Sequence, residues 1–144
     1  MIVESTFTPP FWLRSPHLQT LWPYLFHSRR RTPVRRERLE LPDGDFIDLD
    51  WNTQPHGPVV VILHGLSGSI KSHYARGLLH ALQSRGLRGV VMNFRGCSGE
   101  PNRLARSYHA GETGDLDTVM SMLRRREPDV PLAAVGISLG GNVL

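Results

Sequence analysis

The spacing of hydrophobic positions divides the chain into three zones. Residues 1–34 are rich in proline and aromatic side chains and show no sustained period. Residues 35–54 alternate apolar with polar positions in two short runs, a pattern typical of a β-hairpin. Residues 58–144 alternate continuous apolar runs with stretches of helical period. We therefore predict an N-terminal segment over residues 1–34 and one folded unit over residues 35–144.

The folded unit is predicted to begin with the hairpin and to continue with strands and helices in turn. In the hairpin, Arg38–Leu41 and Phe46–Trp51 flank the turn residues Asp43-Gly44. Apolar runs rich in β-branched residues predict three buried strands, over Pro58–Leu63, Gly89–Phe94 and Leu132–Gly136. Apolar stripes at helical spacing predict two helices, over Ser72–Arg85 and Thr113–Arg126. Such alternation indicates right-handed crossovers and a parallel sheet, so the predicted class is α/β.

The predicted sheet is incomplete at its last strand. The helix that begins after this strand is cut off at Leu144, which leaves one face of the third parallel strand bare. We therefore expect this chain to be the N-terminal part of a longer protein.

Composition favours an ordinary globular protein, with 40% hydrophobic and 21% charged residues. Prolines and polar residues interrupt the apolar region Phe7–Phe26, so we expect no membrane-spanning helix there. The first residues lack a basic stretch followed by a continuous apolar core, so no secretory signal is predicted. The single cysteine, Cys97, excludes an internal disulfide and fits a reducing compartment, which favours a cytoplasmic location.

The net charge of +4 owes much to one arginine-rich run. The run consists of Arg29, Arg30, Arg31, Arg35, Arg36 and Arg38. A patch for nucleic acid or for an anionic membrane surface is one interpretation, and a solvated connector before the first strand is the other. No aromatic residue interleaves the run as a base-stacking surface requires, so we favour the connector and predict no nucleic-acid partner.

For the aromatic residues of the N-terminal segment, packing along the core is favoured over contact with a lipid surface, because prolines interrupt a regular amphipathic helix.

A candidate nucleophile lies where the last predicted strand ends. Gly136-Ile137-Ser138-Leu139-Gly140 matches the pattern G-x-S-x-G. In that arrangement Gly136 and Gly140 remove side chains that would clash where the chain doubles back, and the serine hydroxyl projects above the sheet. A glycine-rich phosphate-binding loop is the alternative, but neither the Lys-Ser/Thr of a P-loop nor a G-x-G-x-x-G after the first strand is present. We predict Ser138 as a catalytic nucleophile.

A second turn with chemical potential, His64-Gly65-Leu66, follows the first buried strand. Acyl transfer needs two backbone N–H donors for the oxyanion of its tetrahedral intermediate. We assign one donor to Leu139, the residue after the nucleophile, and the other to Leu66, with His64 and Gly65 shaping the loop. A tight turn without a catalytic role is the alternative for His64 and Gly65.

Three further residues lie in the turn after the second buried strand. Cys97 has no histidine partner nearby in the sequence, so a structural thiol is favoured over a reactive one. Arg95 and Glu100 have two interpretations, which stay open: they shape the mouth of the site, or they pair with each other.

Four motifs together resemble the YheT-like α/β-hydrolases, a subgroup related to the ABHD-type lipases of eukaryotes. They are His64–Ser69, Met92–Glu100, His109–Asp117 and Gly136–Asn142, and Ser15–Thr20 is similar to the segment that precedes the core there. The resemblance covers essentially the whole chain. It implies the α/β-hydrolase fold and a carboxylic-ester or acylglycerol hydrolase with a Ser-His-Asp triad, no cofactor, and a small-molecule or lipid ester as substrate.

In this resemblance Ser138 matches the family nucleophile, whereas the family's acid and base histidine lie beyond Leu144. Because the base follows the serine in an α/β-hydrolase, His109 is expected to order its loop rather than to act as base. His109, Glu112 and Asp115 suggest a metal cluster, but the helix dipole already explains acids at a helix start, so no metal site is predicted. We expect the 144-residue chain alone to be inactive. A non-catalytic module and an acyltransferase using the same serine are the alternatives.

Overall fold

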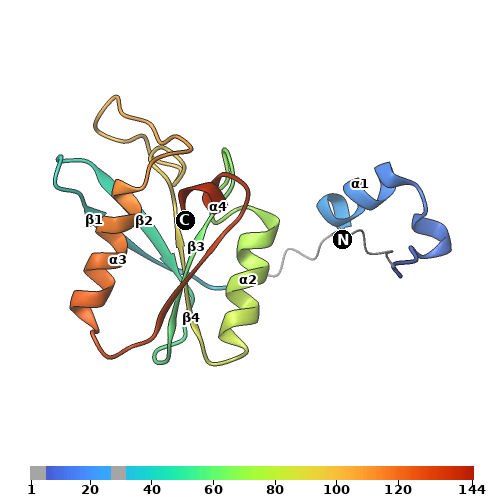
Figure 1. Ribbon diagram of the computed structural model, residues 1–144, viewed down its shortest axis with the longest axis horizontal. Helices are drawn as coiled ribbons and strands as arrows, with labels where there is room; N and C mark the ends of the chain where they lie inside the picture. Colours follow the sequence, from blue (N-terminus) through green and yellow to red (C-terminus); the bar gives the residue numbers. More distant parts are fainter. Residues whose placement is uncertain (1–5, 27–31) are drawn as a thin grey trace, which may run out of the picture.

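The computed structural model describes residues 6–26 and 32–144, and its folded unit is built on a five-stranded sheet (Figure 1). The strands are β1 (Arg35–Glu40), β2 (Phe46–Trp51), β3 (Val59–Leu63), β4 (Arg88–Met92) and β5 (Leu132–Gly136). Their order in the sheet is β1-β2-β4-β3-β5. The strands β4, β3 and β5 are parallel, whereas β2 pairs antiparallel with both β1 and β4. The predicted α/β class and the hairpin are confirmed.

Helices α2 (His73–Gln83) and α3 (Gly114–Arg126) flank the sheet on opposite sides (Figure 1). On one face, Val61 and Leu63 of β3 belong to the same apolar cluster as Val119 of α3. On the other face, Ile62 belongs to a cluster with Leu79 of α2. Alternate side chains of a strand point to opposite faces, so a continuous apolar run is what a strand covered on both sides requires.

Two short helices complete the described chain. Helix α4 (Leu139–Val143) follows β5 directly, and α1 (Pro16–Phe26) follows a 3-10 turn over Phe11–Leu13. Among the described residues, every helix is too short or too polar to serve as a membrane span.

The N-terminal segment differs from expectation, because α1 lies apart from the sheet and its helices (Figure 1). Trp22 stacks on Phe26 at 4.2 Å between ring centroids and meets Trp12 edge-on at 4.8 Å. These aromatic rings therefore pack on one another, and Trp22 stays 40% exposed and Phe26 63% exposed. The prediction that this segment packs along the core is wrong for the described residues.

The described arginines of the run belong to the hairpin itself and are not a solvated connector before it. Arg35, Arg36 and Arg38 belong to β1, while Arg29–Arg31 lie outside the described residues. Arg36 lies opposite Asp50 in the antiparallel register, and Arg38 lies opposite Asp48. Each guanidinium binds the facing carboxylate with two hydrogen bonds of 2.8–3.0 Å. Strand β1 thus begins before the predicted start at Arg38, and the facing carboxylates neutralise the charges of Arg36 and Arg38.

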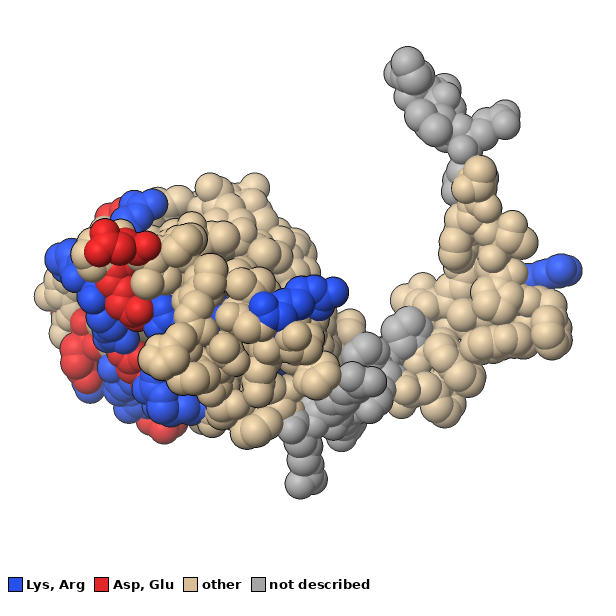
Figure 2. Space-filling model, turned by 90° about the horizontal axis from the view of Figure 1, so that it is seen from below, with Lys and Arg blue, Asp and Glu red and all other residues tan. Residues whose placement is uncertain are grey.

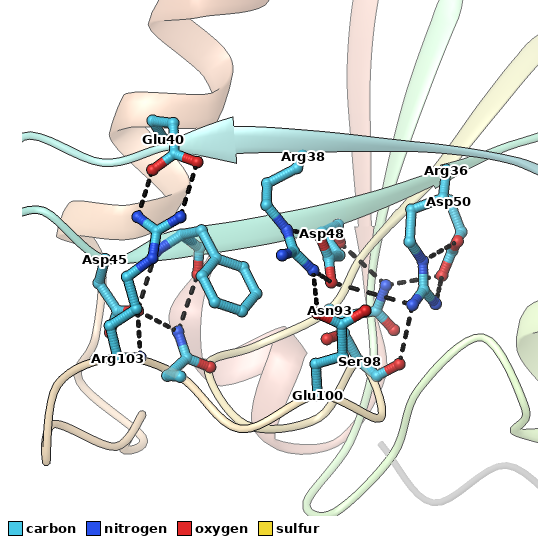
Figure 3. Close-up of polar contacts among 12 residues, drawn as sticks. Arg36, Arg38, Glu40, Asp45, Asp48, Asp50, Asn93, Ser98, Glu100 and Arg103 are labelled. Atoms are coloured by element: carbon cyan, nitrogen blue, oxygen red, sulfur yellow. Dashed lines mark hydrogen bonds and ion pairs between the residues drawn. The ribbon is translucent and has the colours of Figure 1, made fainter.

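The carboxylates of β2 are buried, although they occupy the polar positions of an alternating strand. Asp48 and Asp50 are each 1% exposed. The loop that follows β4 covers them: Arg36 also donates to the carbonyl of Ser98, and Arg38 to the carboxylate of Glu100 (Figure 3). On the surface, basic and acidic side chains are interspersed over the same end of the folded unit (Figure 2). Arg36 and Arg38 thus belong to an ion-pair network rather than to a uniform basic patch.

Candidate active site

Ser138 lies in a strained turn between β5 and α4. Its backbone has φ 53° and ψ −116°, outside the regions that a residue with a side chain readily adopts. Such strain typically costs about 1–3 kcal/mol and persists only where the surrounding structure imposes it. A Cβ on Gly136 would lie 2.3 Å from the carbonyl oxygen of Gly140, so the turn requires glycine there. Ser138 itself is exposed, with its residue at the end of the sheet where β5 stops.

The end of β3 lies against this turn and carries the second predicted site element to it. Leu63 faces Gly136 in the parallel register, and its carbonyl accepts a 3.0 Å hydrogen bond from the N–H of Ile137. A Cβ on Gly140 would lie 2.5 Å from the carbonyl oxygen of Leu63. Both glycines of the serine motif are therefore needed for close approach of backbone to backbone, as the motif predicts.

The loop that follows β3, His64–Gly68, reaches Ser138. A Cβ placed on Gly65 would lie 3.4 Å from the Cβ of Ser138, which is van der Waals contact. The loop is tightly turned, because the N–H of Gly68 donates to the carbonyl of Gly65 at 2.9 Å and Ser67 adopts φ 54°. The structure thus brings together Gly65 and Ser138, which are 73 positions apart in the sequence.

Two backbone N–H groups at this junction have no acceptor within the described residues. The N–H of Leu66 lies in the loop between amides that are both hydrogen-bonded, and the Leu66 side chain is 72% exposed. Leu139 is the first residue of α4, so its N–H has no intrahelical partner. These are the two donors that the sequence predicts for an oxyanion.

His64 has a structural role that the sequence does not specify. Its ring is fully buried, Nδ1 lies 2.8 Å from the carbonyl oxygen of Gly65, and Nε2 accepts the N–H of Phe94 at 3.1 Å. These partners require the neutral tautomer with the proton on Nδ1. Burial lowers the pKa of His64, against a smaller opposite effect of the hydrogen bond to Gly65. Both ring nitrogens are therefore engaged, and His64 joins the ends of β3 and β4 through its ring.

The remaining candidates are each placed by an identifiable partner. Arg95 and Glu100 do not pair with each other: Arg95 binds Asp115, Asp45 and Asp43, and Glu100 binds Arg38. Burial raises the pKa of the Cys97 thiol, against a smaller lowering by the hydroxyl of Tyr108. Cys97 is therefore an ordinary protonated thiol at neutral pH.

The acids near the start of α3 bind arginines. Glu112 accepts a 2.7 Å hydrogen bond from Arg106, and Asp115 is bound by Arg95. His109 accepts the N–H of Gly111 through Nδ1 at 3.1 Å, and so orders its own loop. Within residues 6–26 and 32–144, no group of three or more His, Cys, Asp or Glu side chains is placed to hold a metal ion.

Two tyrosines complete the site, and the sequence reasoning did not identify them. The hydroxyl of Tyr74, in the first turn of α2, accepts the N–H of Gly65 at 2.9 Å. The hydroxyl of Tyr108, in the loop before α3, accepts the N–H of Ser67 at 2.8 Å. Tyr74 falls on an apolar position of the helix predicted over Ser72–Arg85, so its spacing alone indicates packing. Tyr108 lies 41 positions from Ser67, in a loop without period.

Comparison with known proteins identifies the family of this chain. Residues 58–144 of this chain match the protein family that is described as "alpha/beta hydrolase fold". The Escherichia coli K12 protein named "Putative esterase YheT" is 51% identical over 145 residues, which cover 98% of this chain and 43% of that protein. The human protein named "Phospholipase ABHD3" is 32% identical over 152 residues, covering 99% of this chain and 37% of its own length. The predicted resemblance to the YheT-like group is confirmed, and the chain spans less than half the length of these relatives.

A more distant relative and a solved structure agree with this assignment. A "Monoacylglycerol lipase" of Saccharomyces cerevisiae is 30% identical over 111 residues, covering 76% of this chain and 24% of that protein. The esterase Pf2001 of Pyrococcus furiosus superposes with a TM-score of 0.64 at 20% identity, over 78% of this chain and 44% of that one. At that identity the superposition establishes the fold.

Proposed function

Because this chain belongs to the alpha/beta hydrolase fold family, we propose that it carries the nucleophile and oxyanion donors of a serine carboxylic-ester hydrolase. The observation that supports this proposal is the strained turn at Ser138, which lies in contact with a loop whose Leu66 N–H is unused. The names of the relatives, an esterase, a phospholipase and a monoacylglycerol lipase, support ester substrates of small-molecule or lipid type.

The proposed reaction has two steps. The Oγ of Ser138 attacks the ester carbonyl carbon while its proton passes to a histidine base. This attack forms a tetrahedral intermediate. The N–H groups of Leu66 and Leu139 donate to the oxyanion of that intermediate. The C–O bond to the alcohol breaks, the base returns the proton to the departing alcohol, and an acyl-enzyme remains on Ser138. Water then attacks the acyl carbon and gives a proton to the base. The bond between the acyl carbon and Oγ breaks, the base returns the proton to Oγ, and the carboxylic acid leaves with the serine hydroxyl restored.

Neither His64 nor His109 is suited to act as the base of this reaction. His64 is unsuited to the role, because it is buried and neutral and both of its ring nitrogens already have partners. His109 uses Nδ1 to accept the N–H of Gly111 and its side chain is 70% exposed. A serine hydroxyl without an adjacent base is a weak nucleophile. We therefore expect negligible ester turnover from the 144-residue chain by itself.

A fluorophosphonate probe tests the proposal in the naturally expressed protein. The probe is expected to attach to Ser138, and the variant Ser138→Ala is expected to lose both labelling and ester hydrolysis while it keeps its melting temperature. Ser84→Ala is the matched control, because the Ser84 hydroxyl donates to the carbonyl of Ala81 at the exposed end of α2. A folded protein that is never labelled, or labelling that persists in Ser138→Ala, would overturn the proposal.

Two alternatives are separated by further outcomes of the same experiment. A non-catalytic module predicts a folded protein with neither labelling nor turnover. An acyltransferase predicts labelling at Ser138, but with acyl transfer to an added alcohol in preference to water. Product analysis with a competing alcohol such as glycerol distinguishes that activity from hydrolysis.

A further inference from the structure

Three consecutive peptide groups of the loop after β3 are each held by hydrogen bonds. The N–H of Gly65 donates to the hydroxyl of Tyr74 at 2.9 Å. The carbonyl of Gly65 lies 2.8 Å from Nδ1 of His64 and accepts the N–H of Gly68 at 2.9 Å. The N–H of Ser67 donates to the hydroxyl of Tyr108 at 2.8 Å. The N–H of Gly65, the carbonyl of Gly65 and the N–H of Ser67 are thus all bound by groups of the protein itself.

This arrangement determines the direction of the one remaining amide. In a trans peptide, the carbonyl of one residue and the N–H of the next lie in one plane and point in opposite directions. The carbonyl of Gly65 points toward His64 and Gly68, so the N–H of Leu66 points away from them. The peptides on either side cannot rotate freely, because each tyrosine hydroxyl holds one of their N–H groups.

We propose that Tyr74 and Tyr108 are positioning residues, whose hydroxyls hold the amides of Gly65 and Ser67 and leave the N–H of Leu66 as the loop's oxyanion donor. This proposal rests on the proposed function. A loop with glycine at positions 65 and 68 has many backbone conformations, and only a preorganised donor stabilises an oxyanion without a reorganisation cost. The two hydroxyls, from different elements, supply that restraint.

The position of Tyr108 depends on the loop over residues 95–112, which is anchored at several points. Near its start, Glu100 is bound by Arg38 at 2.7 Å (Figure 3). Further on, Asn102 donates to the carboxylate of Asp45 at 2.8 Å and Arg103 binds Glu40 across the end of β1 (Figure 3).

Two contacts hold the loop over residues 95–112 close to the loop His64–Gly68. One is a stack of aromatic rings and the other is a hydrogen bond to α4. The ring of Tyr108 stacks on Phe94 with centroids 5.0 Å apart and planes 10° apart. The carbonyl of Ala110 accepts a 2.8 Å hydrogen bond from the side chain of Asn142 in α4. The ion pairs on β1 and β2 therefore connect through Tyr108 to the donor at Leu66.

The variants Tyr74→Phe and Tyr108→Phe test this role, because each removes one hydroxyl and keeps the ring. In the naturally expressed protein, each variant is expected to lower kcat for a nitrophenyl ester about tenfold, since small displacements of a catalytic group have large effects on rate. KM is expected to stay within about twofold, because the oxyanion donor acts on the intermediate more than on bound ester. Affinity for a trifluoromethyl ketone, which forms a tetrahedral adduct with serine, is expected to fall by the same factor as kcat.

Thr118→Val is the control for loss of a hydroxyl, because Thr118 donates within α3 to the carbonyl of Gly114. It is expected to leave kcat, KM and ketone affinity unchanged. The proposal is overturned if both tyrosine variants keep kcat and ketone affinity within about twofold of the unsubstituted protein, or if KM alone changes. If one variant fails to fold, the other decides, since each hydroxyl holds a different amide. Failure of the proposed function itself is a distinct result, namely an unsubstituted protein without turnover or labelling.

Discussion

Replacement of Arg95 by methionine is expected to destabilise the fold more than any exposed arginine substitution. Arg95 is 3% exposed and its guanidinium binds Asp115 with two hydrogen bonds of 2.7 Å. It also lies 3.1 Å from the carboxylate of Asp45 and 2.8 Å from that of Asp43. The cluster joins the hairpin turn, the end of β4 and the start of α3.

The magnitude follows from what the substitution leaves behind. Methionine has a similar length but no charge, so the carboxylates of Asp45 and Asp115, which are 0% and 4% exposed, lose a cation that binds both. Removal of one partner of a buried ion pair typically costs about 3–5 kcal/mol. We expect about 3 kcal/mol, the lower end, because Asp43 at the edge of the cluster is in contact with solvent. That loss is a large fraction of the roughly 5–15 kcal/mol that stabilises a typical protein, about a fifth to three fifths.

Urea unfolding of the naturally expressed protein measures this effect. Arg103→Met is the matched control, because it breaks an ion pair with Glu40 in which both side chains are largely exposed, and a far smaller loss is expected. The double variant Arg95→Met/Asp115→Leu is expected to recover part of the loss, since it removes one of the stranded carboxylates. A loss for Arg95→Met no larger than that for Arg103→Met would refute the reasoning.

Two further expectations concern the glycine of the turn and the response to acid. Gly140→Ala places a Cβ 2.5 Å from the carbonyl oxygen of Leu63, so we expect a loss of about 1–3 kcal/mol and of probe labelling, with Gly111→Ala unaffected in both assays. Burial raises the pKa of Asp48, but the hydrogen bonds from Arg38 and the charges of Arg38 and Arg36 lower it by more, so the net shift is downward. The stabilising effect of the Asp48 carboxylate is therefore fully present above about pH 4, the pKa of the unfolded state, and is lost as the pH falls below that value through the folded pKa. The lowered pKa of His64 leaves the native ring neutral, so its contribution is lost as the pH falls below about 6.5. The urea midpoint is expected to fall in both pH ranges, and the variant His64→Gln is expected to lack the fall below about pH 6.5. A midpoint of the unsubstituted protein that stays constant from about pH 7 to 5 would contradict the expectation for His64.

Much of the fold was predictable because its signals are local. The apolar run over Val59–Leu63 and the spacing of Gly136 and Gly140 each depend on neighbouring residues, and the structure agrees with both. The ends of α2 and α3 were predicted to within two residues, with Gly86 in the left-handed region after α2, whereas α1 was not predicted. The tight turn at Ser138 was predictable for the same reason, since strand, glycine and serine are contiguous.

The unpredicted features depend on contacts between distant parts of the chain. The alternating pattern of β2 does not indicate that Asp48 is buried, because its cover is the loop at Ser98–Glu100. Likewise, Tyr108 gains its role from a hydrogen bond to a residue 41 positions away. Pairing of Arg95 with Asp115 rather than Glu100 follows from the packing of α3 on the sheet, which no spacing rule contains.

Direct detection of the acyl-enzyme tests the central proposal, that Ser138 forms a covalent intermediate. The naturally expressed protein is mixed with a nitrophenyl ester, quenched with acid within milliseconds, digested and analysed by mass spectrometry. We expect the mass of the acyl group on the peptide that contains Ser138, and no such adduct in Ser138→Ala. Ester hydrolysis that continues undiminished in Ser138→Ala, or an acyl group on another residue of the active protein, would contradict the account.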